Sequence, residues 1–187
     1  KTITTGEGGI VTTNNKYLSE KIKKIISHGI VRINNHWIYN VELNGMNLRM
    51  NDFQCALGIS QLKKIGLFLK KRKSICNNYH KFLSNIKEII LPKIPVKYFS
   101  ANHLFMIILK NFDLKKKNRF IKYMLKKKIV VQYHYIPIYK FKIFNDKYNV
   151  KNSNIFYKTA ISLPIYYDLN VEKQKYISNC IKQFFRK

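Results

Sequence analysis

Hydrophobic residues in the first third of the chain change their spacing twice, which predicts different kinds of local structure. Residues 10–13 form a β-branched run after a glycine-rich turn and predict a strand. Apolar residues then recur every three or four positions from Leu18 to Ile26, which predicts a helix that ends near Gly29. Residues 30–50 have no clean periodicity and predict a loop.

A longer helical pattern follows and ends at prolines. Asn51 and Gln54 have the spacing of a capping box, in which each side chain accepts a hydrogen bond from the other residue's backbone amide. Apolar residues continue beyond it at helical spacing, and Gly66 is the position at which one long helix would divide into two. Pro92 and a second proline shortly after it end the pattern. We therefore expect a long helical connection over residues 51–95.

Strand and helix patterns alternate in the remaining residues. The sequence predicts strands over 103–109 and 129–135, with a helix over 114–128 between them. A further amphipathic helix is predicted over 171–185. Alternation of this kind is typical of α/β and α+β proteins. We expect residues 96–187 to form a small domain of their own.

The net charge of +27, from 36 lysine and arginine residues against 9 acidic ones, is the most unusual feature of the composition. Such a charge is typical of proteins that bind polyanions, so a nucleic-acid-binding module is one interpretation. However, the excess is almost all lysine and accompanies abundant Asn, Ile, Tyr and Phe, which A/T-rich codons encode. The lysines are also spread along the whole chain. We therefore favour biased composition over a nucleic-acid partner.

Cysteines, histidines and apolar runs argue against several other classes of protein. The three cysteines form no CxxC pair and the five histidines form no HxxxH or HExxH pattern, so we expect no metal site. A sparse, odd set of cysteines suits a reducing compartment. The longest apolar run, 104–109, is far shorter than the ~20 residues that span a bilayer. With no secretory signal pattern at its start, we expect a cytoplasmic protein that does not enter a membrane.

Residues 1–9 give the first indication of chemistry. They read K-T-I-T-T-G-E-G-G and resemble the cofactor-lysine segment of the DegT/DnrJ-type sugar aminotransferases. Further motifs similar to that family follow in the family's order. They are His28-Gly29, Gly45 to Asn51 (G-M-N-L-R-M-N), Gln54 to Leu62 (Q-C-A-L-G-I-S-Q-L), Arg72, Asn102-His103-Leu104, His134-Tyr135-Ile136-Pro137 and Ser162-Leu163-Pro164. Their joint order over nearly all 187 residues makes the resemblance specific.

The resemblance implies an α/β protein of fold type I that uses pyridoxal 5'-phosphate. Residues 1–50 would end the large cofactor-binding domain, 51–95 would form the helical connection, and 96–187 would form the small C-terminal domain. It also implies a homodimer with shared active sites, in which much of residues 30–70 packs against the partner. The carboxylate beside the pyridine nitrogen and most of the phosphate-binding residues would precede Lys1, so we expect residues 1–187 alone to be inactive.

Lys1 is, by resemblance, the catalytic residue that holds the cofactor. A lysine amine forms an imine with the cofactor aldehyde and, once released, moves a proton between cofactor and substrate carbons. Asn47 is expected to reach the cofactor phosphate of the neighbouring subunit, and Arg49 is the second candidate for cofactor binding, since both donate to an anion. A capping and loop-bracing role is the alternative for Asn47 and Arg49.

His28, His134 and Tyr135 are the candidates for substrate binding. Imidazole and phenol groups hydrogen-bond hydroxyls and phosphate oxygens, although a histidine in an aromatic strand is often simply packed. The segment around His134, Q-Y-H-Y-I-P-I-Y, is most similar to the branch of the family that acts in pseudaminic acid biosynthesis. That branch transfers an amino group from L-glutamate to the 4-keto carbon of a UDP-linked 4-keto-6-deoxy sugar. A nucleic-acid-binding module, or a non-catalytic relative that acts as a scaffold or regulator, remains the alternative.

Overall fold

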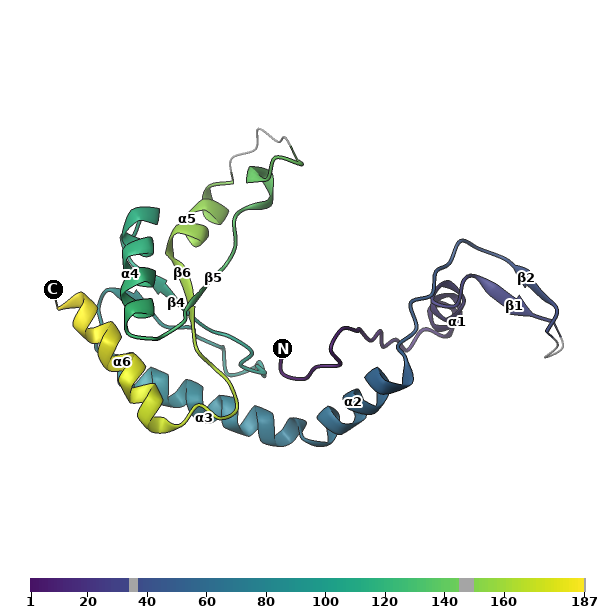
Figure 1. Ribbon diagram of the computed structural model, residues 1–187, viewed down its shortest axis with the longest axis horizontal. Helices are drawn as coiled ribbons and strands as arrows, with labels where there is room; N and C mark the ends of the chain where they lie inside the picture. Colours follow the sequence, from purple (N-terminus) through teal and green to yellow (C-terminus); the bar gives the residue numbers. More distant parts are fainter. Residues whose placement is uncertain (34–36, 145–149, 187) are drawn as a thin grey trace. The chain divides into compact units, whose positions relative to one another are not determined.

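The computed structural model describes residues 1–33, 37–144 and 150–186 of the chain (Figure 1). Contacts between residues divide the chain into two units, Lys1 with Ile3–Ile65 and Thr2 with Gly66–Lys187. The units differ in burial: helices of the first bury no residue, whereas the second contains a hydrophobic core. The division into domains at residues 50 and 95 stays a prediction.

The first unit consists of helices joined by a short hairpin. Its elements are α1 (Lys16–Ile25), β1 (Ile30–Arg32), β2 (Tyr39–Val41) and α2 (Asp52–Lys63). Strands β1 and β2 pair antiparallel, with Val31 opposite Asn40. Both helices begin at an asparagine, since the Asn15 side chain accepts from the Leu18 amide at 3.1 Å and Asn51 begins α2 in the same way.

Two sequence predictions in this unit are confirmed and two are wrong. Helix α1 forms where the apolar spacing predicts it, and the Asn51–Gln54 capping box is present, with bonds of 2.9 and 3.0 Å. The run 10–13 is not a strand, because an extended segment becomes one only when a neighbouring backbone pairs with it, and none does among the described residues. The stretch 30–50 contains the β1–β2 hairpin, whose strands are too short to show alternation; residues 34–36 lie outside the described residues.

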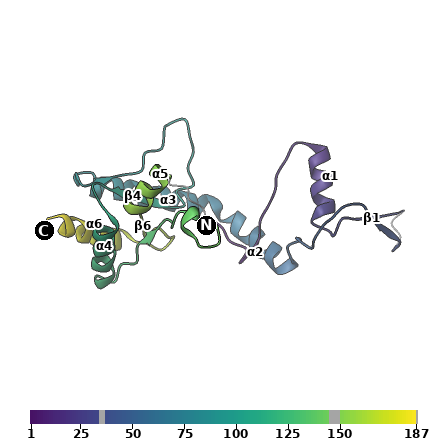
Figure 2. The same cartoon turned by 90° about the horizontal axis from the view of Figure 1, so that it is seen from above.

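The second unit is an antiparallel sheet covered by helices (Figures 1 and 2). Its elements are α3 (Ile65–Leu83), β3 (Ile89–Ile90), β4 (Phe105–Leu109), α4 (Leu114–Lys126), β5 (Gln132–Tyr133), η1 (Ile138–Lys140), α5 (Lys151–Thr159), β6 (Ala160–Leu163) and α6 (Val171–Phe185). The strand order is β3-β4-β6-β5, and each neighbouring pair is antiparallel. In the register of β4 and β6, Ile107 lies opposite Ile161.

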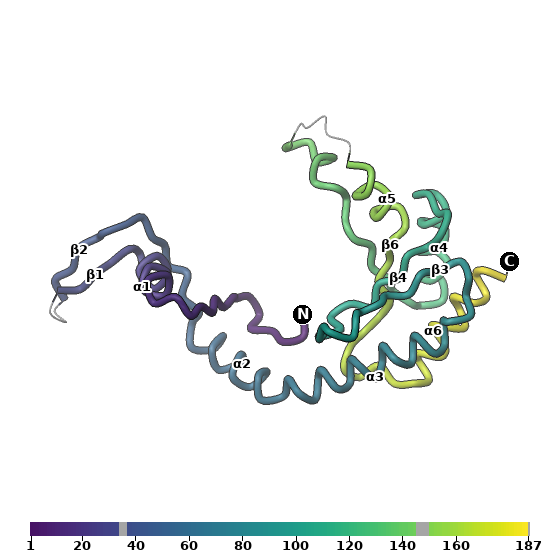
Figure 3. Tube along the Cα trace, turned by 180° about the vertical axis from the view of Figure 1, so that it is seen from behind, coloured from purple at the N-terminus to yellow at the C-terminus, as the bar shows by residue number. Residues whose placement is uncertain are grey.

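The core of this unit lies between the sheet and helices α3, α4 and α6. Alternate residues of β4 are buried, as expected for a strand with one covered face. The side chains of Tyr79 on α3 and Phe105 on β4 pack with ring centroids 5.0 Å apart. Helix α6 runs beside α3 (Figure 3), and the Asn78 amide donates to the Gln174 side chain at 3.0 Å. The core therefore joins α3 to the C-terminal elements.

The predictions for the second unit are confirmed for the segments whose apolar residues keep a regular spacing over many positions. Strand β4 and helices α4 and α6 form as predicted, and the long helical pattern divides at Lys64, two residues before Gly66. The strand predicted over 129–135 is limited to Gln132 and Tyr133. Elements β3, α5 and β6 were missed. All four residues of β6 are buried, so this strand lacks the polar and apolar alternation that identifies a half-buried strand.

Candidate active site

The His-Gly and Gly-x-Asn motifs pack backbone against backbone in the first unit. Gly29 has a φ of 72°, and a Cβ at this position would lie 1.8 Å from the carbonyl oxygen of Leu43. A Cβ on Gly45 would lie 2.3 Å from the backbone nitrogen of Gly29. Only glycine permits such an approach. Both glycines are therefore required by the fold of this motif.

Hydrogen bonds along this contact bring three candidate residues onto neighbouring backbone segments. The amides of residues 46 and 48 donate to the carbonyls of Ile25 and Ile26 at 2.9 and 3.0 Å. The His28 amide donates to the carbonyl of residue 46 at 3.2 Å, and Ser27 forms an isolated bridge with Asn47. The end of α1 is thus fixed to the segment that carries Asn47 and, two residues later, Arg49. The side chains of the three candidate residues on these segments, His28, Asn47 and Arg49, are exposed.

Arg49 lines an open pocket with a volume of about 360 Å³. Its lining also includes Lys23, Lys24, Ser27 and Arg32. Two carboxylates partly balance these cations, since Lys24 lies 2.7 Å from Glu42 and Lys23 lies 3.9 Å from Glu20. The remaining guanidinium groups and the hydroxyl are donors of the kind that bind phosphate. The three cations beside Arg49 could not be inferred from the sequence, because Lys23 and Lys24 at the end of α1 resemble an ordinary solvated face and Arg32 lies on a strand too short to be predicted.

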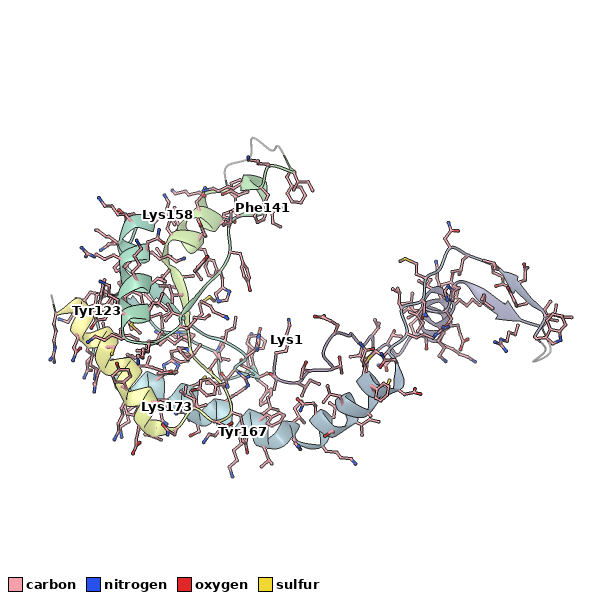
Figure 4. The ribbon with its side chains drawn as sticks, in the orientation of Figure 1. Lys1, Tyr123, Phe141, Lys158, Tyr167 and Lys173 are labelled. Atoms are coloured by element: carbon pink, nitrogen blue, oxygen red, sulfur yellow. The ribbon has the colours of Figure 1, made fainter. Side chains whose placement is uncertain are left out.

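Lys1 begins the extended segment that leads to the glycine-rich turn, and its side chain is exposed (Figure 4). The turn is held by the backbone of Glu7. Its carbonyl oxygen accepts from Thr5 Oγ1 at 3.0 Å and from Nε2 of Gln54, in the α2 capping box, at 2.9 Å. A solvent-accessible primary amine is the group that reacts with an aldehyde. The amine of Lys1 is therefore accessible to an aldehyde, and its role as the cofactor lysine stays a prediction.

His134 and Tyr135 follow β5 in the second unit and differ in exposure. His134 is buried, and its Nε2 lies 2.6 Å from Oγ of Ser162 on β6. Burial, with a contribution from the charge of Lys117, lowers the pKa of His134 and so favours its neutral form. The Tyr135 ring lies edge-on to it at 4.9 Å and is 75% exposed. His134 therefore links β5 to β6, whereas Tyr135 is open to solvent; substrate contact by either stays a prediction.

The candidate residues thus form two groups within separate units. The first unit brings His28, Asn47 and Arg49 onto adjoining segments and also carries Lys1. The second carries His134 and Tyr135. Ser162, the partner of His134, had been noted only as part of a family motif, and its role depends on strand pairing that sequence spacing does not reveal.

The described part of the chain contains neither a cluster of metal ligands nor a membrane-spanning helix. Within residues 1–33, 37–144 and 150–186, no group of three or more His, Cys, Asp or Glu side chains is arranged to hold a metal ion. None of the helices described there is both long and apolar enough to cross a membrane. Cys55 is exposed, Cys76 and Cys180 are buried, and all three are free thiols.

Comparison with known proteins decides the family. A family model described as the DegT/DnrJ/EryC1/StrS aminotransferase family matches residues 1–182. The chain belongs to this aminotransferase family. Membership confirms the resemblance seen in the motifs, together with pyridoxal phosphate as the family's cofactor and the fold type I α/β architecture. It also favours an enzyme over a nucleic-acid-binding module.

Individual relatives agree with the family assignment. The UDP-4-amino-4,6-dideoxy-N-acetyl-beta-L-altrosamine transaminase of Helicobacter pylori is 34% identical over 189 residues, which cover 99% of this chain and 50% of the relative. The Campylobacter jejuni enzyme of the same name is 34% identical over 190 residues, covering 100% and 50%. The solved structure of Helicobacter pylori PseC, an aminotransferase of pseudoaminic acid biosynthesis, superposes with a TM-score of 0.92 at 32% identity and covers 100% of this chain and 51% of that one. The chain therefore spans about half the length of the curated relatives it matches.

Proposed function

We propose that the whole protein transfers an amino group from L-glutamate to the 4-keto carbon of a nucleotide-linked 4-keto-6-deoxy sugar. The observation that carries the proposal is the match to the Helicobacter pylori transaminase, which extends over 99% of this chain at 34% identity. The Lys1 segment and the motif with Asn47 and Arg49 both lie within the matched family region. Because the Helicobacter pylori and Campylobacter jejuni relatives, each 34% identical, are named for a UDP-linked sugar, we propose UDP as the nucleotide.

The donor set of the first unit fits pyridoxal 5'-phosphate. When bound, this cofactor supplies an aldehyde that reacts with amines and a ring that withdraws electrons from the reacting carbon. Lys1 would hold the cofactor through its amine, whereas the exposed amide of Asn47 would bind the cofactor phosphate of the neighbouring subunit, and the guanidinium of Arg49 is the second candidate for cofactor binding. The Lys1 amine would also accept the proton of the reacting carbon and return it, as a general base and then a general acid.

The substrate contacts proposed for His28, His134 and Tyr135 are supported to different degrees. The side chains of His28 and Tyr135 are exposed and free to approach a sugar nucleotide. His134 is buried against Ser162, so it would act on the substrate through the position of Tyr135, which follows it in the chain. We therefore expect a Tyr135→Phe change to raise KM for the sugar nucleotide more than it lowers kcat.

A homodimer with shared active sites is part of the proposal. In the first unit, Ile10, Trp37 and Phe53 have exposed fractions of 86, 83 and 89%. Exposed aromatic and β-branched side chains of this size are common at protein interfaces, so these residues are candidates for contact with another protein surface. The remainder of the whole protein and a partner subunit would provide it. The proposed enzyme acts in the cytoplasm, and neither nucleic acid nor a membrane is among its partners.

Replacing Lys1 with alanine in the whole protein tests the proposal. We expect turnover of L-glutamate with the UDP-linked 4-keto sugar to fall by at least about a hundredfold, the lower end of what a positioned acid–base group contributes. The exposed lysine at the start of α1 provides a matched control, because Lys16→Ala removes one charge outside the motif.

Borohydride reduction with the cofactor gives a readout that does not depend on turnover. Reduction should attach the cofactor covalently to the peptide that contains Lys1, and peptide mapping identifies that peptide. Attachment to a different lysine, or full turnover by the Lys1→Ala variant, would show that the assignment is wrong. Binding of nucleic acid that weakens steeply with added salt, in a protein without turnover, would support the alternative instead.

A further inference from the structure

Lys117 on helix α4 is a buried lysine that the proposed reaction does not use. Its side chain is 1% exposed, and its ammonium donates to the carbonyl oxygen of Tyr157 in the last turn of α5. Burial lowers the pKa of Lys117 to about 8. A buried ammonium is normally paired with a carboxylate, but among the residues that the structure describes no ion pair involves Lys117.

The surroundings of this ammonium add further positive charge. Lys117 Nζ lies 5.5 Å from the centroid of the Tyr133 ring and 5.2 Å from that of Tyr157. The ammonium of Lys140 lies 5.8 Å from the same Tyr157 ring. Aromatic faces attract cations through their quadrupoles but carry no net negative charge. The cluster therefore holds two ammonium groups close to one ring without neutralising either.

A cavity with a volume of about 340 Å³ adjoins this cluster. Its polar lining comes from Lys117, Asn118 and Lys122 on α4 and from Tyr133 and Tyr157, and no residue of its described lining is acidic. Ammonium, amide and phenol groups all donate hydrogen bonds. The volume is well above the ~30 Å³ that one water occupies in the liquid. The lining thus has the charge and the donors to bind an anion, and the space to contain one.

We propose that this cavity binds a small oxyanion, which accepts hydrogen bonds from the Lys117 ammonium and from the side chains of Asn118 and Lys122. A phosphate group or a carboxylate supplies the required oxygen atoms, and the chemistry of recognition is the same for both. The bound anion neutralises the ammonium between α4 and the end of α5. It therefore stabilises the contact between these two helices.

Calorimetric titration of the whole protein with sulfate tests the site. Sulfate stands for the phosphate class and keeps both charges at neutral and mildly alkaline pH; acetate, in a parallel titration, stands for the carboxylate class. Chloride holds the ionic strength constant, because a chain with a charge of +27 attracts anions generally. We expect saturable binding of one anion per chain.

Variants of α4 distinguish the cavity from general attraction. Lys117→Met should weaken binding by at least about tenfold, the effect of losing one charge-assisted hydrogen bond. Lys126→Met is the matched control, because it removes one exposed lysine from the same helix, and its affinity should stay within about twofold of wild type. Lys122→Met changes an exposed residue of the lining, so it tests the site even where Lys117→Met fails to fold.

The outcomes separate the proposal from its alternatives. Saturable binding of either anion that both lining variants weaken and Lys126→Met does not supports the site, and the tighter of sulfate and acetate identifies the class. Absence of saturable binding in the wild-type protein would overturn the proposal. An equal loss of affinity in the Lys122→Met and Lys126→Met variants would also overturn it, because the effect would then come from net charge alone.

Discussion

Replacing Gly29 with alanine tests the backbone contact on which the arrangement of His28 and Asn47 depends. An alanine Cβ would lie 1.8 Å from the carbonyl oxygen of Leu43, so the two segments must separate by more than an ångström to reach ordinary contact. The φ of 72° adds strain, because residues other than glycine rarely adopt this conformation.

The expected cost follows from these two effects. The left-handed conformation costs alanine about 1 kcal/mol. Separating the segments also breaks the hydrogen bonds from the Glu42 amide to the Gly29 carbonyl, at 3.0 Å, and from the His28 amide to the carbonyl of residue 46, at 3.2 Å. Each contributes about 1 kcal/mol. We therefore expect a local destabilisation of about 3 kcal/mol, or roughly a hundredfold in the equilibrium for local opening.

Native-state hydrogen exchange measures this opening directly. The amides of residues 46 and 48 bond to the carbonyls of Ile25 and Ile26, so they exchange when the contact opens. In the whole protein, Gly29→Ala should speed their exchange by roughly a hundredfold. Gly66→Ala is the matched control: a Cβ there meets no atom within 4 Å, and alanine should stabilise α3 by about 0.5–1 kcal/mol without affecting these amides. Exchange within about threefold of wild type in the Gly29→Ala variant would refute the close approach.

Three further predictions concern the two units. Asn51→Ala removes the α2 N-cap and should destabilise that helix by about 1 kcal/mol, seen as faster exchange of the Gln54 amide, which donates a hydrogen bond of 2.9 Å to the Asn51 side-chain oxygen. Tyr79→Phe removes the hydroxyl that donates to the Pro164 carbonyl at 2.9 Å and should lower the free energy of unfolding by about 1 kcal/mol in urea denaturation; no change would indicate that water replaces this bond. Burial lowers the pKa of Lys117 from its ordinary value of 10.5 to about 8 in the folded protein, so between these pH values the unfolded chain binds more protons and stability should rise with pH. Measured against Lys117→Met, the rise should approach about 3 kcal/mol by pH 10.5, and a fall would contradict the assigned pKa.

Long helices with local caps could be predicted from the sequence because their signals lie within the segment itself. Helix α2 has its capping box, and helix α6 has apolar residues at helical spacing over its full length. Strand β6 could not be predicted in this way. It pairs with β4 on one side and β5 on the other, both distant from it in the sequence, and its four residues are buried. Pairing of that kind depends on the fold as a whole.

The candidate residues also differ in how much of their role the sequence alone reveals. The role expected of Lys1 came from a motif that precedes a glycine-rich turn, and no feature of its own distinguishes it from the other lysines. Lys117 is different, because it occupies the apolar face of α4, three residues before Phe120 and seven before Met124, and both of these are fully buried. A lysine at a core position of an amphipathic helix is a signal that the sequence contains. Because Lys117 is the last of three consecutive lysines, this signal is not distinguishable from an ordinary charged segment.

Family motifs that supply no obvious chemistry are explained by the packing of the second unit. The guanidinium of Arg72 on α3 donates to the carbonyl oxygens of Asn102 and His103 at 3.3 and 3.0 Å. These residues enter β4, so one side chain fixes the helix to the start of the central strand. The carbonyl of Pro164, just after β6, accepts from Tyr79, which lies about two turns beyond Arg72 on the same helix. Residues shared with an enzyme family therefore include those that hold strands in place as well as those that react, and only the contacts of each side chain separate the two kinds.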